Sequence, residues 1–281
     1  VGTCNAEILA GITRERASPI EDFVNTHGDH SVRQVLLEVH DPTHFIERNP
    51  EFQADASRRG IRFVVPEPKR HRGGQSEFPR NPWVKGIDHI AIALTPDMME
   101  QEGAWWENLG GKPTKKLDDV MPKDAPSSMM LHCYDFETFG VALIAGLDRE
   151  KESQVTAFTR RHGAPFIQHV AYGVYDLSKF QSHLVRDLGG SMRGEILERP
   201  DDFGRGKIRQ VFGAGFDEGD PAEVSFPEFV ERPESRKGGE ASITFSKQFG
   251  AGLYRQIEDA RAKGERRTLV DFLRMPKDWE P

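Results

Sequence analysis

Residues 143–180 read LIAGLDREKESQVTAFTRRHGAPFIQHVAYGVYDLSKF, and residues 8–45 repeat their pattern without a gap at an offset of 135. An Ala-Gly pair, an Arg-Glu pair, a His-Gly pair and the final phenylalanine occur at matching places in both stretches. A fixed offset held over this length predicts a duplicated structural module. The copies differ at a position that matters for chemistry, because His169 of the later copy corresponds to Gln34 of the earlier one. One copy offers a candidate metal ligand and the other does not.

Strand-like and helix-like segments alternate on both sides of this repeat. Residues 85–94 alternate apolar side chains between two prolines, as a strand does. Residues 97–109 have helical spacing and end at a Gly-Gly pair. We expect further strands at 128–134, 139–145, 166–174, 207–213 and 222–231, and helices at 151–161 and 177–188. The order predicts an α+β fold in which two consecutive βαβββ modules curl their mixed sheets around a central cleft.

The sequence divides into four predicted parts. Residues 1–70 are predicted to form an N-terminal, metal-free and partial βαβββ module, because only seven residues precede its repeated segment. Residues 71–84 are a polar, Gly-containing linker, residues 85–245 are the catalytic domain, and residues 246–281 are a C-terminal lid helix and tail. A partial module would leave a sheet edge open. We expect a further segment of chain or a second copy in a homo-oligomer to cover this edge, with the C-terminal domain as the alternative.

Composition and charge exclude several classes of protein. The chain has 281 residues and a net charge of −7, which gives no electrostatic case for binding nucleic acid or an anionic membrane. Its two cysteines, Cys4 and Cys133, are too few for a disulfide framework or a cysteine-rich zinc module. No apolar run is long enough to span a bilayer. We therefore expect a soluble, cytoplasmic globular protein.

Three residues form a candidate metal site. His89 lies in the opening strand of one module, His169 in the opening strand of the next, and Glu228 in a late strand. Taken alone, each has an ordinary structural explanation: a strand histidine is usually a hydrogen-bonded core residue, and Glu228 could pair with Arg232. Together, two imidazoles and one carboxylate make the facial triad of non-haem Fe(II) oxygenases, which leaves positions free for substrate and dioxygen. We interpret the central cleft as a metal cleft with a single site.

Several short motifs occur in a fixed order along most of the chain. They are His27-Gly28-Asp29, Gly86-Ile87-Asp88-His89, Gln168-His169-Val170-Ala171, Gln210-Val211-Phe212, the segment from Phe226 to Arg232, and Phe249-Gly250-Ala251-Gly252. In this order and spacing the chain resembles the vicinal oxygen chelate superfamily. Within that superfamily it is similar to the group of 4-hydroxyphenylpyruvate dioxygenase and hydroxymandelate synthase.

The resemblance implies an enzyme that uses Fe(II), with His89, His169 and Glu228 as the metal ligands. Its substrates would be a small 2-oxo acid and O2. The 2-oxo acid would chelate the metal, lose CO2 and be hydroxylated in the same molecule. The protein would position the substrate and exclude water, while the metal supplies the redox chemistry.

The resemblance also implies roles for residues beyond the metal. Gln168 and Gln210 are expected to bind and orient the substrate, and Phe249 and Tyr254 to line the pocket, with the helix after Phe249 as its lid. The chain departs from the group in two places: residues 146–150 lack the usual Pro- and Asn-containing turn, and the last Gly-rich motif continues with Leu-Tyr instead of Asn-Phe. We therefore expect 4-hydroxyphenylpyruvate to be turned over poorly and a different 2-oxo acid to be the substrate.

Other functions remain open at this point. Extradiol ring-cleaving dioxygenases share the fold and the triad, but need an acid–base His or Tyr beside the metal, for which Tyr172 and His132 are the candidates. Isomerases and glyoxalase-like enzymes of the superfamily use four protein ligands, and the sequence offers no convincing fourth. A non-enzymatic protein could also bind a ligand in the same cleft. Oxygen uptake with CO2 release distinguishes the first function from all of these.

Overall fold

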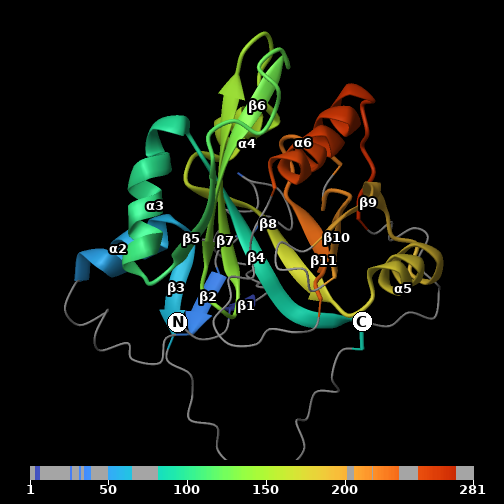
Figure 1. Ribbon diagram of the computed structural model, residues 1–281, viewed down its shortest axis with the longest axis horizontal. Helices are drawn as coiled ribbons and strands as arrows, with labels where there is room; N and C mark the ends of the chain where they lie inside the picture. The colour runs from blue at the N-terminus through green and yellow to red at the C-terminus, as the bar shows by residue number, and fades with distance from the viewer. Residues whose placement is uncertain are drawn as a thin grey trace, which may run out of the picture.

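The computed structural model describes residues 4–6, 26, 32, 35–38, 50–64, 82–200, 206–216, 218–233 and 246–269. These residues form a three-stranded sheet and a larger, curled eight-stranded sheet, with helices packed around them (Figure 1). The α+β class predicted from the sequence is confirmed. Gln34, most of the predicted linker at 71–84 and the tail beyond residue 269 lie outside the described residues.

Two βαβββ modules build the larger sheet. The first module consists of β4 (Val84–Leu94), η2 (Pro96–Met98), α3 (Met99–Asn108), β5 (Lys112–Leu117), β6 (Ser127–Asp135) and β7 (Gly140–Asp148). The second consists of β8 (Phe166–Val174), α5 (Leu177–Ser182), the π-helical turn η3 (His183–Asp187), β9 (Met192–Pro200), β10 (Lys207–Gly213) and β11 (Phe226–Glu231). Helix α4 (Gln154–His162) joins the two modules, and α6 (Lys247–Ala262) follows the second.

The strand order is symmetrical about the pair of opening strands. It runs β5-β6-β7-β4-β8-β11-β10-β9. Strands β4 and β8 are antiparallel to each other, and each is parallel to the last strand of its own module, β7 and β11 respectively. The strands that carry His89 and His169 therefore lie side by side at the middle of the sheet (Figure 1).

From Asp88 to Leu94, strand β4 is buried on both faces, which explains the continuous apolar run at its end, residues 90–94. Ala91 and Ala93 belong to the apolar cluster on the inner side of the curled sheet. Ile90 and Ile92 belong to a second cluster, which contains the fully buried Trp106 of α3. Small residues on the inner face leave room for a cavity, and large residues on the outer face hold α3 against the sheet.

The N-terminal sheet packs against this outer layer. It contains β1 (Cys4–Ala6), β2 (Val35–Glu38) and β3 (Ile61–Val64), with β2 in the middle and α2 (Pro50–Arg58) before β3. Val35, Leu37 and Ile61 are fully buried in the same cluster as Trp106. Residues of α3 and of the larger sheet therefore cover the apolar face of this sheet. How the sheet edge is covered, and where the domains divide, remain predictions.

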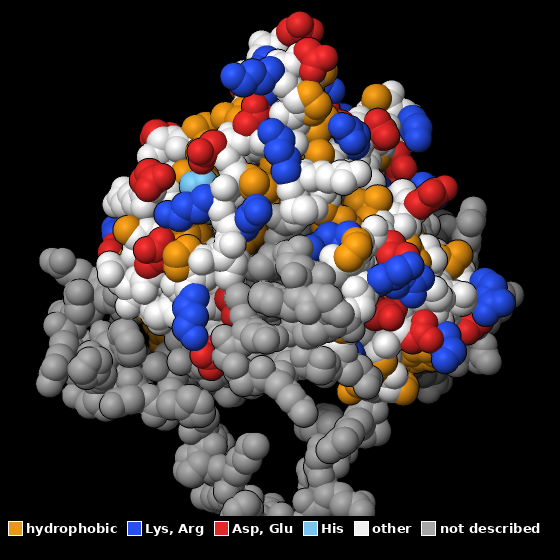
Figure 2. All heavy atoms as spheres, in the orientation of Figure 1, with side chains coloured by type: hydrophobic (Ala, Val, Ile, Leu, Met, Phe, Trp, Pro, Cys, Tyr) orange, Lys and Arg blue, Asp and Glu red, His pale blue; other side chains and the backbone are white. Residues whose placement is uncertain are grey.

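Two features of the structure bear on the expectations drawn from composition, namely the distribution of charge on the surface and the character of the helices. On the face shown in Figure 2, positive and negative side chains are intermixed around the described residues. Within the described ranges, no helix combines the length and the apolar character needed to cross a membrane.

Candidate metal centre

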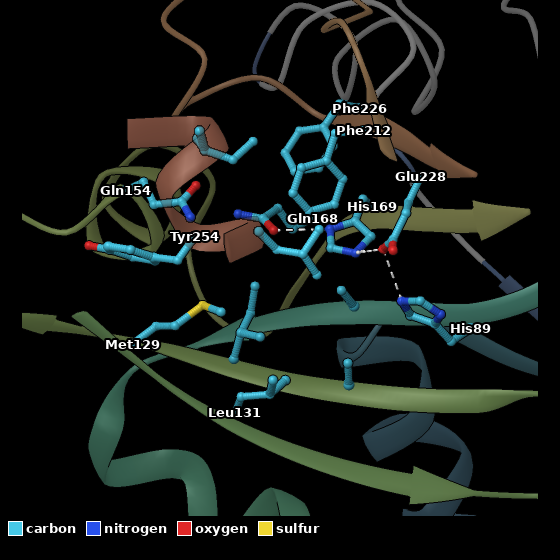
Figure 3. A pocket seen from close by; sticks show the side chains of 15 residues that line it. His89, Met129, Leu131, Gln154, Gln168, His169, Phe212, Phe226, Glu228 and Tyr254 are labelled. Atoms are coloured by element: carbon cyan, nitrogen blue, oxygen red, sulfur yellow. Dashed lines mark hydrogen bonds and ion pairs between the residues drawn. The ribbon is translucent and has the colours of Figure 1, made fainter. Parts of the chain in front are cut away.

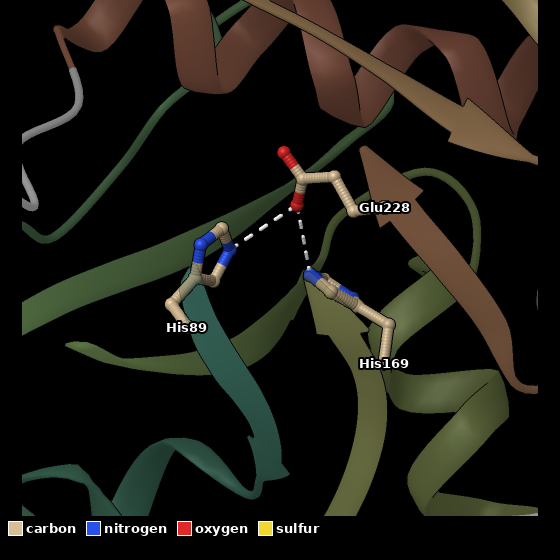
Figure 4. Close-up of side chains that lie close together, drawn as sticks. All are labelled: His89, His169 and Glu228. Carbon is tan, nitrogen blue, oxygen red and sulfur yellow. Dashed lines mark ion pairs between the residues drawn. The ribbon is translucent and has the colours of Figure 1, made fainter. Parts of the chain in front are cut away.

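The structure brings the three predicted ligands together at the centre of the sheet. One ligand atom from each of His89, His169 and Glu228 lies within 4.8 Å of the others, and all three residues are buried (Figure 4). The Oε2 atom of Glu228 lies 3.1 Å from Nε2 of His89 and 3.2 Å from Nε2 of His169. This convergence follows from the topology, because β11 pairs with β8, and β8 pairs with β4.

A bulge precedes each histidine. The register between β4 and β8 shifts by one residue at Asp88 on β4 and by one residue at Gln168 on β8. A bulge re-aims neighbouring side chains, which would otherwise alternate between the two faces of the sheet. As a result, Asp88 reaches His89 with a distance of 2.9 Å from Oδ1 to Nδ1, and Gln168 reaches His169 with 3.1 Å from Oε1 to Nδ1.

These hydrogen bonds set the orientation and tautomer of both rings. The oxygen atoms of Asp88 and Gln168 are acceptors, so Nδ1 of each imidazole carries the donated proton. In a neutral ring the lone pair of Nε2 then faces Glu228. Metal-binding histidines are commonly held in this way through the nitrogen that does not bind the metal. Two lone pairs and a carboxylate oxygen thus converge on one point, which requires a cation or a proton.

The pKa shifts of the three buried groups also indicate that a cation or a proton is needed between them. Burial alone would lower the pKa of His89, but the carboxylates of Glu228 and Asp88 raise it to about 9. Burial alone would raise the pKa of Glu228, but the two histidines lower it to about 2. Burial lowers the pKa of His169. A proton on His89 therefore takes the place of the cation in the metal-free protein.

The donor set fits a divalent metal. Two neutral imidazoles and one carboxylate on one face are the ligands of non-haem Fe(II) sites. The second carboxylate oxygen of Glu228, Oε1, is buried and has no hydrogen-bonding partner among the described residues. An unpaired buried carboxylate oxygen is costly without a cation beside it. This orphaned atom supports a metal site over a purely structural cluster.

Arg232 supports the site from behind. Its Nε donates to Oδ2 of Asp88 at 2.7 Å, and its Nη2 donates to Oδ1 at 2.9 Å. Burial would raise the pKa of Asp88, but the guanidinium holds it well below the ordinary value of 3.8. Asp88 therefore stays ionised and keeps the Nδ1 proton of His89 in place. The sequence suggested that Arg232 could pair with Glu228, but in the structure it pairs with Asp88.

An apolar cavity adjoins the candidate ligands (Figure 3). Besides the three ligands it is lined by Ala91, Met129, Leu131, Ala142, Ile144, Gln154, Gln168, Phe212, Phe226, Leu253, Tyr254 and Ile257. Lining that is mostly apolar, with a few polar atoms, is typical of a small-molecule site. Helix α6 contributes Leu253, Tyr254 and Ile257, so it closes one side of the cavity.

Two of the four predicted substrate-binding residues line this cavity, namely Gln168 and Tyr254. Gln210 does not line it; it is fully buried on β10, and its amide has no hydrogen-bonding partner among the described residues. Phe249 packs in the inner apolar cluster, with the guanidinium carbon of Arg199 5.3 Å from its ring centre. The substrate-binding roles of all four residues remain predictions.

Among the polar residues of the site, sequence reasoning missed Asp88 and Gln154. Asp88 lies directly before His89, and this Asp-His pair was the available signal for its role. Gln154 was missed altogether, because it looks like an ordinary first residue of a helix. The two acid–base candidates for an extradiol enzyme, Tyr172 and His132, are both absent from the cavity lining. Tyr172 stacks on Phe229 outside the cavity, and His132 contacts Asp118 through Nε2.

Solved structures share the fold of this protein over most of the chain. A triple mutant of 4-hydroxymandelate synthase from Streptomyces coelicolor matches with a TM-score of 0.64 at 14% identity, over 88% of this chain and 81% of that chain. A fusion protein of a xylose isomerase-like TIM barrel and 4-hydroxyphenylpyruvate dioxygenase matches with a TM-score of 0.53 at 16% identity, over 86% of this chain and 42% of that chain. No protein-family model and no curated protein matches the sequence. At these identities the likeness establishes the fold.

Proposed function

We propose that this chain, which has the fold of the vicinal oxygen chelate superfamily, is a non-haem Fe(II) dioxygenase. Its reaction would decarboxylate a 2-oxo acid and hydroxylate the same molecule. One observation carries the proposal: the buried trio His89, His169 and Glu228 opens onto an apolar cavity, with both imidazoles oriented through Nδ1. When bound, Fe(II) would supply the reaction with dioxygen.

The residues of the chain would hold and shield the reacting groups. Asp88 and Gln168 fix the two imidazoles, and Arg232 fixes Asp88. The Nε2 atom of Gln168 is buried without a partner among the described residues and lines the cavity, so it can donate to an oxygen atom of the substrate. The apolar walls and α6 exclude water, which strengthens such polar contacts.

The main alternative for this fold, an extradiol dioxygenase, is less well supported because the cavity lacks the predicted acid–base residues. An extradiol dioxygenase needs an acid–base His or Tyr beside the metal, and neither Tyr172 nor His132 lines the cavity. The hydroxyl of Tyr254, which does line it, is hydrogen-bonded to Ser127 at 2.8 Å and Ser153 at 3.2 Å. A non-enzymatic ligand-binding protein of the same fold is the other alternative, and turnover distinguishes it.

The test is an anaerobic reconstitution followed by a substrate screen. The protein is loaded with Fe(II), exposed to O2 with a panel of 2-oxo acids, and assayed for oxygen uptake and CO2 release. We expect uptake and release in equal amounts with at least one 2-oxo acid, and with 4-hydroxyphenylpyruvate only slowly. The variant His169→Gln serves as the control without a complete ligand set. Oxygen uptake with catechols but with no 2-oxo acid would favour the extradiol alternative.

A further inference from the structure

Arg193 on β9 is a buried cation to which the proposed reaction assigns no role. Only 2% of its surface is exposed, and neither Nε nor Nη1 has a hydrogen-bonding partner among the described residues. Burial of a cation with unsatisfied donors destabilises a fold, and an apolar side chain of similar volume is often more stable in such a place. Groups of this kind are expected where function requires them.

The carboxylates near Arg193 each have another arginine as partner. Oε1 of Glu265, which follows α6, lies 3.9 Å from Nε of Arg193, whereas Oε2 of Glu265 lies 3.0 Å from Nη2 of Arg267. The other nearby carboxylate, that of Asp220, contacts Arg261. Burial lowers the pKa of Arg193 only to about 10, so its guanidinium stays charged at neutral pH. Within the described ranges, this charge therefore has no carboxylate of its own.

The ring of Phe226 contacts both Arg193 and the candidate metal ligand His169. The guanidinium carbon of Arg193 lies 5.3 Å from the centre of the Phe226 ring, and this ring stacks on the imidazole of His169 with their centres 5.0 Å apart. Figure 3 shows Phe226 beside His169 at the wall of the cavity. Whatever the angle between the two contacts, the charge of Arg193 lies within about 10 Å of the imidazole centre.

Other cations do not supply the same field to the cavity. Among the described residues, no lysine or arginine lines it. Arg232, which supports the ligands from behind, is neutralised by its two hydrogen bonds to Asp88. An anion that enters this apolar cavity loses the hydration of its charge, and a buried cation nearby offsets part of that loss.

We propose that the buried charge of Arg193 stabilises an anion bound at the metal, without touching that anion. This inference rests on the proposed function, because that function requires an anionic 2-oxo acid to chelate the metal. Two unit charges about 10 Å apart at an effective dielectric constant of about 20 change a binding constant by about tenfold. Salt screens a buried charge much less than an exposed one, so the effect should persist at physiological ionic strength.

The charge acts with opposite sign on the metal and on an anionic ligand of the metal. Arg193→Met removes a positive charge, so anion binding should weaken about tenfold while the affinity for the divalent metal stays the same or rises. The thermal unfolding midpoint should also stay the same or rise, because the unsatisfied donors are gone. A purely structural role of Arg193 would instead lower all three quantities.

The test uses azide and imidazole as probes of the Co(II)-loaded protein. Both are small ligands for an open metal position, but azide is an anion and imidazole is largely neutral at pH 8. Their dissociation constants are measured from the cobalt absorption bands at constant ionic strength, and Co(II) affinity is measured by competition with a chelator. We expect Arg193→Met to weaken azide binding about tenfold and imidazole binding by less than about twofold.

Two further variants assign the effect to the buried charge. Arg193→Lys keeps the charge and should keep most of the azide affinity. Arg255→Met removes an exposed arginine of α6, with the same change in net charge, and should alter azide binding by less than about twofold because water and salt screen that position. Equal azide losses in Arg193→Met and Arg193→Lys, or parallel losses of azide, imidazole and metal affinity in Arg193→Met, overturn the inference.

The outcome also separates this inference from the proposed function. If the wild type binds Co(II) and azide, and Arg193→Met binds azide equally well, the metal site stands and the role of Arg193 falls. If the wild type binds no more Co(II) than His169→Gln does, the proposed function falls, and this inference falls with it.

Discussion

Asp88 and Gln168 occupy equivalent positions in the two modules: each is the extra residue of a bulge between β4 and β8, and each accepts the Nδ1 proton of the histidine that follows it. The two modules thus share the geometry of the support but differ in its chemistry. Asp88 is charged and neutralised by Arg232, whereas Gln168 is neutral and keeps a free N–H group in the cavity. One histidine is supported by an ion pair, and the other by a residue that can also contact substrate.

The ion pair behind His89 should affect both stability and metal affinity. Asp88→Asn leaves the guanidinium of Arg232 buried without a counter-charge, which should lower the free energy of unfolding by about 3–5 kcal/mol. It should also weaken Fe(II) binding by about 10–100-fold, because the imidazole loses its charged partner. Chemical denaturation of the metal-free protein and competition with a metal chelator measure the two effects.

A second substitution tells these effects apart. Adding Arg232→Met to Asp88→Asn removes the uncompensated charge, so the double variant should recover part of the lost stability. It should not recover the metal affinity. If metal affinity returned together with stability, Asp88 would only hold the fold together and would not position His89.

His169→Gln should abolish metal binding while leaving the fold intact. The substitution places in the second module the residue found at position 34 in the first copy of the repeat. In the wild type, Fe(II) at about 100 times its dissociation constant should add about 2.7 kcal/mol to the free energy of unfolding. The variant should show no such gain and no bound iron by elemental analysis. An unfolded variant by circular dichroism would instead mean that His169 is structural.

The sequence predicted the inner strands of the fold better than its edges. Strands β8 and β10 begin and end where the apolar alternation predicted. Strands β5 (Lys112–Leu117) and β9 (Met192–Pro200) were not located individually. They are the two edge strands of the larger sheet, and β5 has no fully buried residue. Charged, partly exposed edge strands protect a sheet from further pairing, and for the same reason they lack the apolar signal.

In the candidate site, residues marked by the local sequence could be predicted, whereas contacts that depend on how distant elements pack could not. His89 and His169 could be selected because each lies in an opening strand, and the repeat marks the second of them. The partner of Arg232 could not be predicted, because it depends on which carboxylate lies nearest after β11 and β4 are in place. The position of Gln154 likewise depends on the packing of α4 against α6.

The N-terminal sheet should depend on one buried ion pair for its attachment to α3. Arg59 contacts Glu102 through two hydrogen bonds, with 2.5 Å from Nε to Oε2 and 2.6 Å from Nη2 to Oε1, and its guanidinium lies over the ring of Trp105. Glu102→Ala leaves Arg59 buried and unpaired by a carboxylate, at a cost of about 3–5 kcal/mol. Limited proteolysis should then cut the segment 50–64 faster than in the wild type. Equal cutting rates would show that apolar packing alone fixes this sheet.

Cys133 should be unreactive in the folded protein over the ordinary pH range. It is fully buried on β6, and burial raises the pKa of its thiol from 9.0 to about 12. At pH 8 only about one thiol in ten thousand is then the nucleophilic thiolate. We expect iodoacetamide to label Cys133 only through unfolding, at a rate that follows denaturant concentration. Peptide mass spectrometry distinguishes this label from labelling of Cys4.

The same raised pKa predicts how stability changes in alkaline solution. The unfolded thiol ionises above about pH 9 while the folded thiol stays neutral, so this group stabilises the fold fully below that pH and loses its contribution as the pH rises towards 12. The loss should amount to about 1.4 kcal/mol per pH unit within this window. Cys133→Ala, measured by urea denaturation at pH 8 and pH 10.5, should lack this component of the decline. If the variant and the wild type declined in parallel, Cys133 would ionise equally in both states, and its neutral burial would be contradicted.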